Sequence, residues 1–510
     1  MLPMTGVDGS FLNLETPQTP MHVGSLHLFE VPDGDVAGFH PMLVRHIAAR
    51  LDRVPVFRRR LAPMPLQFAN PVWVDDDGVD LDHHIRRVVL PAPGTREQLF
   101  RAAADLHSTL MDRSRPLWMI YVFEGLASGE VAYYIKVHHA VLDGQAGVLL
   151  AQALFDVTAT PRAVPRPGRG VAAEHPGMGE LAAAALKHDA AQIVKFVRHL
   201  PDVVGTLAGL LGGRGGSSGG GAKPSAGMGQ NFGFGPRTPL NVSITGERSF
   251  AGLSLPLDAL KQLAAAHDAK LNDIVLALCS GALRRYLARH GGIPKKPLVA
   301  AMPISLRASG NTEFSTQATM TLVNLHTHRA DAVRRLHAIR DAAGAAKALA
   351  GRTRSILPTD FPSITVPWVL HGLATLYGRS GLAGTIPPIA NLIVSNVPGP
   401  QVPLYAAGAR LRTYWPLSIP EHGLGLNITV MSYAGAMGFG FTAARVAVPD
   451  ARPLARALAE AFDELVTKST PRAARKTPPR KSAPRKGAPR KGATKAATKA
   501  AATPGRGARR

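Results

Sequence analysis

The stretch Val137-His138-His139-Ala140-Val141-Leu142-Asp143-Gly144 follows directly on residues 130–136, which read EVAYYIK. That preceding run is rich in β-branched and aromatic residues and predicts a buried strand, so the two histidines should stand where the strand ends. The imidazole titrates close to neutral pH, which makes a histidine in this position a suitable general base. The stretch therefore indicates catalysis by proton abstraction as one chemistry for this chain.

Asp143 and Gly144 complete the stretch and suggest how its loop is held. Gly144 permits a tight turn, and Asp143 can accept from a backbone N–H or pair with an arginine, holding the imidazole in one tautomer. Two other interpretations stay open on residue chemistry alone. Adjacent histidines also occur at ordinary strand ends, or as two of three metal ligands, although no nearby Cys or acidic cluster completes a metal set.

The pattern His-His-x-x-x-Asp-Gly resembles the signature of the acyl-CoA-dependent acyltransferases built like chloramphenicol acetyltransferase, which include condensation domains and carnitine acyltransferases. Further motifs resemble, in the same chain order, those of the bacterial wax ester synthase/diacylglycerol acyltransferase family. They are Met4-Thr5-Gly6-Val7-Asp8, Glu15-Thr16-Pro17, Met21-His22-Val23-Gly24, Pro116-Leu117-Trp118, PRTPLN at 236–241, NDIVLA at 272–277, MPISLR at 302–307 and VSNVPGP at 394–400. Because the ordered series spans residues 1 to about 467, the chain is identified as a member of that family.

The resemblance implies a mixed α/β fold with two chloramphenicol acetyltransferase-like lobes and the active site between them. Changes in composition place the first lobe at residues 1–157 and the second at 236–467. Between them, residues 158–235 form a linker rich in Pro and Gly, with an amphipathic helix at 180–200. Such a helix could lie on a bilayer, but packing over the domain junction is favoured.

Local patterns of apolar residues predict the elements of both lobes. They are helices at 41–51, 96–110, 147–155, 257–267 and 272–289, strands at 72–74, 118–124, 130–137, 249–255, 297–303 and 391–395, a strand pair within 313–327, and a hairpin of 425–433 with 438–442.

The resemblance also implies a mechanism and the roles of the residues in the motif. His139 takes the proton from an alcohol, whose oxygen attacks the thioester carbonyl of acyl-CoA directly and releases an ester and free CoA. His138 and Asp143 order the loop, and Gly144 permits its turn. Pro116-Leu117-Trp118 is interpreted as structural.

Asn272 is the candidate substrate contact in the second lobe. The oxyanion of the tetrahedral intermediate needs a donor, and His138, Asn272 or a hydroxyl within 313–327 stay open for it. Asn272 or Asp273 could instead cap the helix that begins there. No metal and no cofactor are expected, because acyl-CoA is a co-substrate.

The acyl acceptor has several candidates, because every alcohol presents the same hydroxyl to the same base. Diacylglycerol, which would give triacylglycerol, is the first choice, and a long-chain alcohol, which would give a wax ester, is the alternative. A function of a different class is a lipid-surface protein that tethers a partner through its basic tail. The acyl chain length and the oligomeric state are not indicated by the sequence.

Length and composition suit a globular protein of two domains. The chain has 510 residues, of which 45% are hydrophobic. Its single cysteine, Cys279, excludes an internal disulfide, lies in an apolar helical stretch and is consistent with a reducing compartment. The first residues do not resemble a signal peptide, and no apolar run reaches the roughly 20 residues of a spanning helix. A cytoplasmic protein is expected, peripherally associated with the inner face of the membrane or with lipid droplets.

The C-terminal residues 468–510 differ from the rest of the chain. They carry 15 of the 59 Lys and Arg and none of the 35 Asp and Glu, so only +9 of the formal net charge of +24 belongs to residues 1–467. Without aromatic residues and with regular prolines, this tail is predicted to be disordered. Its partners would be polyanions, and anionic membrane is favoured over nucleic acid; a tail that only aids solubility is the third possibility.

Overall fold

The computed structural model of the protein describes residues 2–4, 6–62, 70–142, 150–164, 179, 234–305, 318–353 and 367–469. These residues belong to one compact unit, Met1–Ser469, and a second unit, Thr470–Arg510, lies outside them. The predicted linker helix at 180–200 and nearly all of the predicted basic tail also lie outside the described residues. None of the helices in the described ranges is both long enough and apolar enough to cross a membrane.

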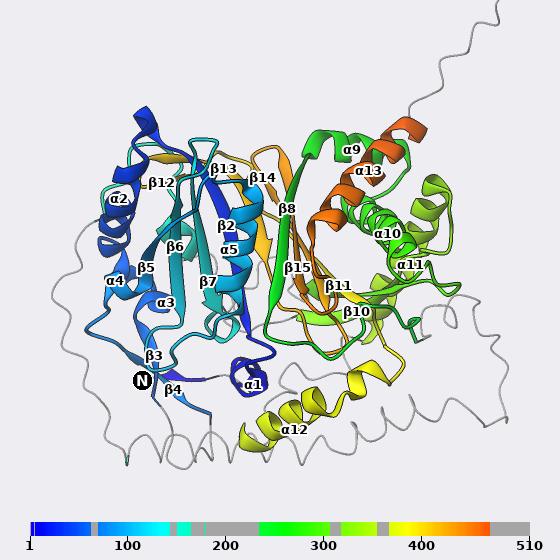
Figure 1. Ribbon diagram of the computed structural model, residues 1–510, viewed down its shortest axis with the longest axis horizontal. Helices are drawn as coiled ribbons and strands as arrows, with labels where there is room; N and C mark the ends of the chain where they lie inside the picture. Colours follow the sequence, from blue (N-terminus) through cyan, green and yellow to red (C-terminus); the bar gives the residue numbers. More distant parts are fainter. Residues whose placement is uncertain are drawn as a thin grey trace, which may run out of the picture. The chain divides into compact units, whose positions relative to one another are not determined.

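The first sheet has six strands in the order β12-β13-β2-β7-β6-β5 (Figure 1). Within this sheet, β6 (Trp118–Glu124) and β7 (Val131–His138) form an antiparallel pair in which every residue is buried. β2 (His22–Glu30) pairs antiparallel with β7, and β5 (Ile85–Val89) runs parallel to β6. The apolar runs that predicted these two central strands are continuous because the sheet is covered on both faces.

Helices cover the two faces of this sheet and separate two cores. Residues Ala132 and Tyr134 of β7 pack in the core that includes α5 (Arg96–Ser108), whereas Tyr133 and Ile135 pack in the core that includes α2 (Val36–Ala48). This division follows from the alternation of side chains along a strand.

The helix predicted at 41–51 is displaced in the structure, because it begins at Val36. The Asp35 carboxylate accepts from the Gly38 N–H and caps this earlier start. Pro41, where the predicted helix began, lies inside the observed helix. For the helix predicted at 147–155, residues 150–154 are helical and the preceding residues lie outside the described ranges.

Two strands from the second half of the chain complete the first sheet, which the division into two lobes did not predict. They are β12 (Tyr405–Ala406) and β13 (Ala409–Leu417). β13 pairs antiparallel with β2, with Leu417 opposite Gly24 and Arg410 opposite Glu30. The first sheet therefore cannot be complete without residues from beyond the linker.

Glycines allow β13 to pass close to the second sheet. A Cβ built on Gly440 would clash with the backbone oxygen of Pro416, and one on Gly438 would clash with that of Tyr414. Both glycines lie in β15 (Ala436–Ala444), which belongs to the second sheet. The two sheets therefore meet backbone to backbone along β13 and β15, where only glycine fits.

The second sheet also has six strands, in the order β10-β9-β11-β14-β15-β8. The predicted hairpin is confirmed as β14 (Leu426–Tyr433) and β15, joined by Ala434 and Gly435, both with positive φ. Such a pair of positive φ values matches the twist of the flanking strands. The remaining strands are β8 (Arg248–Pro256), β9 (Val299–Ser305), β10 (Ala318–Asn324) and β11 (Leu392–Val397). Of the strand pair predicted within 313–327, only β10 lies in the described residues, and it pairs with β9.

Helices pack on the second sheet around α10 (Leu271–Arg289), which is buried along most of its length. Its neighbours are α9 (Leu257–Ala266), α11 (Ala332–Thr353) and α13 (Arg452–Ser469). Cys279 of α10 is fully buried, and burial raises the pKa of its thiol to about 12, as expected of a small core residue.

The second lobe was predicted to end at residue 467, but α13 continues to Ser469. The Lys468 ammonium lies 2.9 Å from Glu464 and 3.3 Å from Asp331, and the Ser469 hydroxyl lies 2.6 Å from the His267 ring. These contacts extend the helix by two residues beyond the composition boundary.

Candidate active site

His138 and His139 lie where β7 ends, as the sequence predicts. His138 is the last residue of the strand, and His139 begins the short 3₁₀ helix η4 (His139–Val141). The His138 side chain is 1% exposed. The ring of His139 stacks on Phe11 of α1 (Gly6–Leu14), with ring centres 3.8 Å apart. The change from strand to 3₁₀ helix thus gives the two adjacent imidazoles different surroundings.

The hydrogen bonds of His138 determine which of its ring nitrogens carries the proton. The backbone N–H of Ala140 donates to Nδ1 of His138 at 3.1 Å, so Nδ1 is the acceptor and carries no proton. The ring proton must then be on Nε2, which lies 3.3 Å from a carboxylate oxygen of Glu15. Nδ1 of His138 is therefore occupied by the Ala140 N–H, and Nε2 faces the Glu15 carboxylate.

The Glu15 carboxylate is a buried charge at the centre of this cluster, and its side chain is 3% exposed. Its Oε1 accepts from the Met21 N–H at 3.1 Å and lies 3.2 Å from Nε2 of His22. Its Oε2 accepts from the Arg113 guanidinium at 2.8 and 3.2 Å. Burial favours the neutral acid, but the contacts with His138 and His22 outweigh it and hold the pKa of Glu15 well below its ordinary value.

The sequence did not assign a role to Glu15 or to His22, although both lie in motifs of the N-terminal region. Strand β2 begins at His22, which lies directly opposite His138 in the sheet. The pairing of β2 with β7 is a long-range contact, and it brings the segment just after Glu15 to the end of β7. The only signal in the sequence was an acidic residue seven positions before a histidine.

His139 has the properties of a neutral base. Burial lowers its pKa to about 4, the adjacent His138 lowers it further, and its own backbone carbonyl opposes this lowering in part. A neutral imidazole carries a proton on one ring nitrogen only, so the other ring nitrogen can accept a proton. At neutral pH this ring can therefore accept a proton from a bound hydroxyl.

Asp143 and Gly144 lie outside the described residues, so their predicted roles in ordering and turning the loop stay predictions. The part of the loop that is described shows how its start is held. His139 N–H donates to the Met21 carbonyl at 2.8 Å, and Leu142 N–H donates to the His139 carbonyl at 3.2 Å.

Asn272 meets the VSNVPGP motif in the second lobe. Asn396 of β11 donates to the side-chain oxygen of Asn272 at 3.3 Å, and the Asn272 amide donates to the Met302 sulfur at 3.5 Å. Asp273, not Asn272, serves the helix terminus, because its carboxylate accepts from the Lys270 N–H at 2.8 Å. Asp273 therefore caps the helix, whereas Asn272 connects the NDIVLA motif to the VSNVPGP motif.

Trp118 of the Pro116-Leu117-Trp118 motif is fully buried. Its indole N–H donates to the Phe57 carbonyl at 3.2 Å, and its ring stacks on His84 with centres 4.3 Å apart. This residue supports the sheet next to β7 from the face opposite α5.

Metal binding was the alternative interpretation of the paired histidines. Within the described ranges, no group of three or more His, Cys, Asp or Glu side chains is arranged to hold a metal ion.

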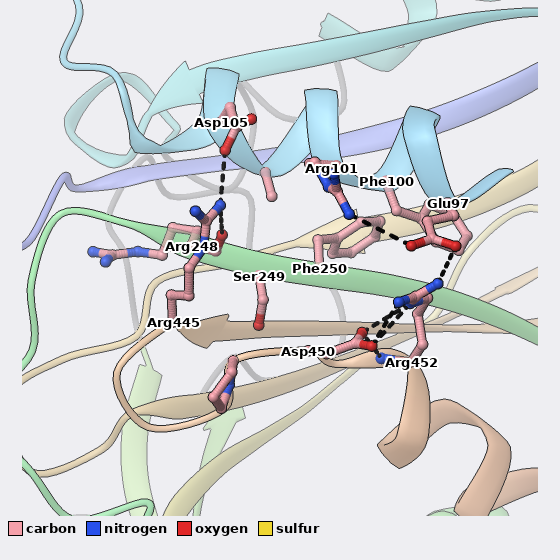
Figure 2. A pocket seen from close by; sticks show the side chains of 12 residues that line it. Glu97, Phe100, Arg101, Asp105, Arg248, Ser249, Phe250, Arg445, Asp450 and Arg452 are labelled. Atoms are coloured by element: carbon pink, nitrogen blue, oxygen red, sulfur yellow. Dashed lines mark hydrogen bonds and ion pairs between the residues drawn. The ribbon is translucent and has the colours of Figure 1, made fainter. Parts of the chain in front are cut away.

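A separate cavity of about 310 Å³ lies at the junction of α5 and β8 (Figure 2). Arg445 pairs with Asp105 at 2.9 Å, and Arg452 pairs with both Glu97 and Asp450. These ion pairs join α5 of the first lobe to the loop and helix start that follow β15. Neither His138 nor His139 lines this cavity, so it is distinct from the candidate active site.

Buried histidines should make the fold sensitive to acid. Burial lowers the pKa to about 4 for His22, His46 and His84 and to about 3 for His27. Between pH 6.5 and 4 the unfolded chain then binds protons that the folded chain does not, so stability is complete above pH 6.5 and falls as the pH is lowered. Each pKa unit corresponds to about 1.4 kcal/mol. Urea denaturation at pH 7, 6 and 5 should show a falling free energy of unfolding, and a constant value would contradict this prediction.

Comparison with known proteins identifies the family. The model of the wax ester synthase/diacylglycerol acyltransferase catalytic domain matches residues 4–275, and that of the family's C-terminal domain matches residues 315–466. The chain is 34% identical over 460 residues to the O-acyltransferase WSD of Acinetobacter baylyi, covering 88% of this chain and 93% of that protein. It is 36% identical over 467 residues to a Mycobacterium tuberculosis protein provisionally named a diacylglycerol O-acyltransferase, covering 91% and 99%.

Solved structures agree with this assignment. The wax ester synthase/diacylglycerol acyltransferase of Marinobacter aquaeolei is 30% identical, with a TM-score of 0.65 over 92% of this chain and 100% of that chain. The first condensation domain of the calcium-dependent antibiotic synthetase is 16% identical with a TM-score of 0.50, covers 92% of this chain and 97% of that one, and shares the fold alone. The predicted mixed α/β fold is therefore confirmed, and the chain belongs to the wax ester synthase/diacylglycerol acyltransferase family.

Proposed function

We propose that this protein is an acyl-CoA-dependent O-acyltransferase that esterifies diacylglycerol to triacylglycerol, with His139 as the general base. The observation that carries this proposal is the placement of His139 at the end of β7, where its ring stacks on Phe11 and burial lowers its pKa to about 4, so that it is neutral at physiological pH. The names of the relatives from Acinetobacter and Mycobacterium support the class of reaction.

The reaction needs no covalent intermediate on the protein. His139 removes the proton of the acceptor hydroxyl as its oxygen attacks the thioester carbonyl, and the C–O bond forms. The tetrahedral intermediate then expels the CoA sulfur, the C–S bond breaks, and the protonated His139 returns the proton to the thiolate. Holding both substrates at one base converts an encounter of two molecules in solution into a local event.

Asn272 is proposed as a substrate contact in the second lobe. Its side-chain oxygen accepts from Asn396, and its amide nitrogen has only a weak sulfur acceptor in Met302. That nitrogen can exchange the sulfur for an oxygen of a substrate at little cost. His138 is the weaker of the two named candidates for the oxyanion donor, because its ring nitrogens face Ala140 and Glu15.

The first experiment measures CoA release from palmitoyl-CoA with dioleoylglycerol or hexadecanol as the acceptor, with identification of the lipid product. Faster release with dioleoylglycerol, and triacylglycerol as the product, supports the proposal. A preference for hexadecanol selects the alternative, wax ester synthesis. Absence of acceptor-dependent release with either lipid would overturn both and direct attention to other acyl acceptors.

Peripheral association with the inner face of the membrane or with lipid droplets is proposed because both acceptors reside in lipid. A tethering function through the basic tail is the alternative of a different class. The chain should be shortened after Ser469, since α13 and its contacts extend to that residue. Retained turnover in detergent by this shortened chain supports an enzyme, whereas loss of binding to anionic vesicles, with little turnover in either form, supports the tether.

A further inference from the structure

We propose that Glu15 is a positioning residue that fixes the His139–Val141 turn, and with it the ring of His139, from three sides. This inference rests on the proposed role of His139 as the general base. Glu15 does not contact the reacting atoms in this scheme. It acts through His138, through the backbone of Met21 and through α1.

The first connection passes through His138. Glu15 Oε1 lies 3.3 Å from Nε2 of His138, and this negative charge favours the tautomer with the proton on Nε2. Only in that tautomer is Nδ1 free to accept the Ala140 N–H, which it does at 3.1 Å. A His138 ring with its proton on Nδ1 would face the Ala140 N–H donor to donor, and the turn after His139 would lose its anchor.

The second connection passes through the peptide of Met21. The Met21 N–H donates to the same Oε1 at 3.1 Å, and the Met21 carbonyl accepts from the His139 N–H at 2.8 Å. Two consecutive backbone N–H groups, those of His139 and Ala140, are thus held by acceptors that Glu15 orders. Together they fix the backbone on both sides of the His139 Cα.

The third connection passes through Arg113 to α1. One guanidinium nitrogen of Arg113 donates to Glu15 at 2.8 Å and to the Leu12 carbonyl at 2.7 Å. Leu12 belongs to α1, the helix that also carries Phe11, on which the His139 ring stacks. The carboxylate therefore holds the backbone of His139 and the surface against which its ring rests.

A buried carboxylate is costly unless its contacts compensate for the lost water. Here the compensating groups all belong to the surroundings of the two histidines: Met21, His22, Arg113 and His138. Lys136 on the same face of β7 is also buried, and the Glu15 charge opposes the lowering of its pKa, which stands at about 7. Replacing Glu15 with a neutral side chain of the same size would remove this buried negative charge without leaving a cavity.

The test compares Glu15→Gln with a matched control, Glu124→Gln. Glu124 is another buried carboxylate of the first lobe, and it pairs with Arg87. It is the last residue of β6, so it lies at the end of that strand that is far from the two histidines. We expect Glu15→Gln to lower kcat by about 10- to 100-fold with a change in KM below about 3-fold, because misplacing a base affects the chemical step. Glu124→Gln should leave kcat within about 2-fold, whatever its effect on thermal stability.

A second readout does not depend on turnover. In ¹⁵N-histidine-labelled protein, the ring signals of His138 and His139 can be assigned from their loss in His138→Gln and His139→Ala. The His138 ring should show the Nε2–H tautomer in the native chain. The ring signals of both histidines should shift in Glu15→Gln and should keep their native positions in Glu124→Gln. If Glu15→Gln does not fold, Glu15→Asp, which keeps the charge on a shorter arm, should fold and show an intermediate loss.

The outcomes separate this inference from the proposed function. Native turnover together with an unchanged kcat and unchanged ring signals in Glu15→Gln would overturn the role of Glu15 and leave the function intact. No turnover by the native chain would reject the proposed function. In that case the ring signals still decide whether Glu15 orders the two histidines.

Discussion

His139→Ala should reduce kcat/KM for acceptor-dependent CoA release by about 10²- to 10⁴-fold, the usual contribution of a positioned general base. The ring is partly buried and stacks on Phe11, with a pKa of about 4, so at neutral pH it is already the unprotonated form that the reaction requires. Alanine removes the proton acceptor while leaving the backbone hydrogen bond to Met21 available. The measurement is initial rate against acyl-CoA concentration at a saturating acceptor.

His290→Ala is the matched control, because His290 is an exposed histidine that follows the end of α10 and stacks on Tyr286. Its kcat/KM should stay within about 2-fold of the native value. If the kcat/KM of His139→Ala stayed within about 10-fold of the native value, His139 would be rejected as the base, and another group would have to accept the proton.

Trp118→Ala should lower the free energy of unfolding by about 3–5 kcal/mol, as is typical when a large aromatic side chain is removed from a core. The indole is fully buried, packs on His84 and Phe57 with ring centres 4.3 and 4.7 Å away, and donates to the Phe57 carbonyl. The substitution leaves a cavity and also removes the donor that satisfies that buried carbonyl. Urea denaturation at constant pH measures the loss.

Val89→Ala provides the comparison within the same sheet. Val89 lies in β5, next to β6, but is 66% exposed, so its truncation should change the free energy of unfolding by less than about 0.5 kcal/mol. A loss below about 1 kcal/mol for Trp118→Ala would show that the motif is not a structural element of the first lobe.

Those elements whose patterns are local were predicted from the sequence. The predicted ranges were correct to within a few residues for the buried strands β6 and β7, the buried helix α10 and the β14–β15 hairpin. An element that is buried on both faces has a continuous run of apolar residues, and one that is buried on one face has a periodic run, so both can be recognised in the sequence. β2 and β13 were not predicted, although each has nine residues. Their sequences mix glycine, histidine, serine and arginine with apolar residues, so only their pairing makes them strands.

The candidate site likewise has features that the sequence predicted and features that only the tertiary structure revealed. The sequence determined the two histidines, their place at a strand end and the family to which they point, because the motif is contiguous and its order along the chain is fixed. The tertiary structure decided which groups surround them: it brought Glu15 and His22 beside His138, and Asn396 beside Asn272 across 124 positions. A side chain's partners across the fold follow from strand register and sheet order, which sum many weak long-range contacts that no local stretch encodes.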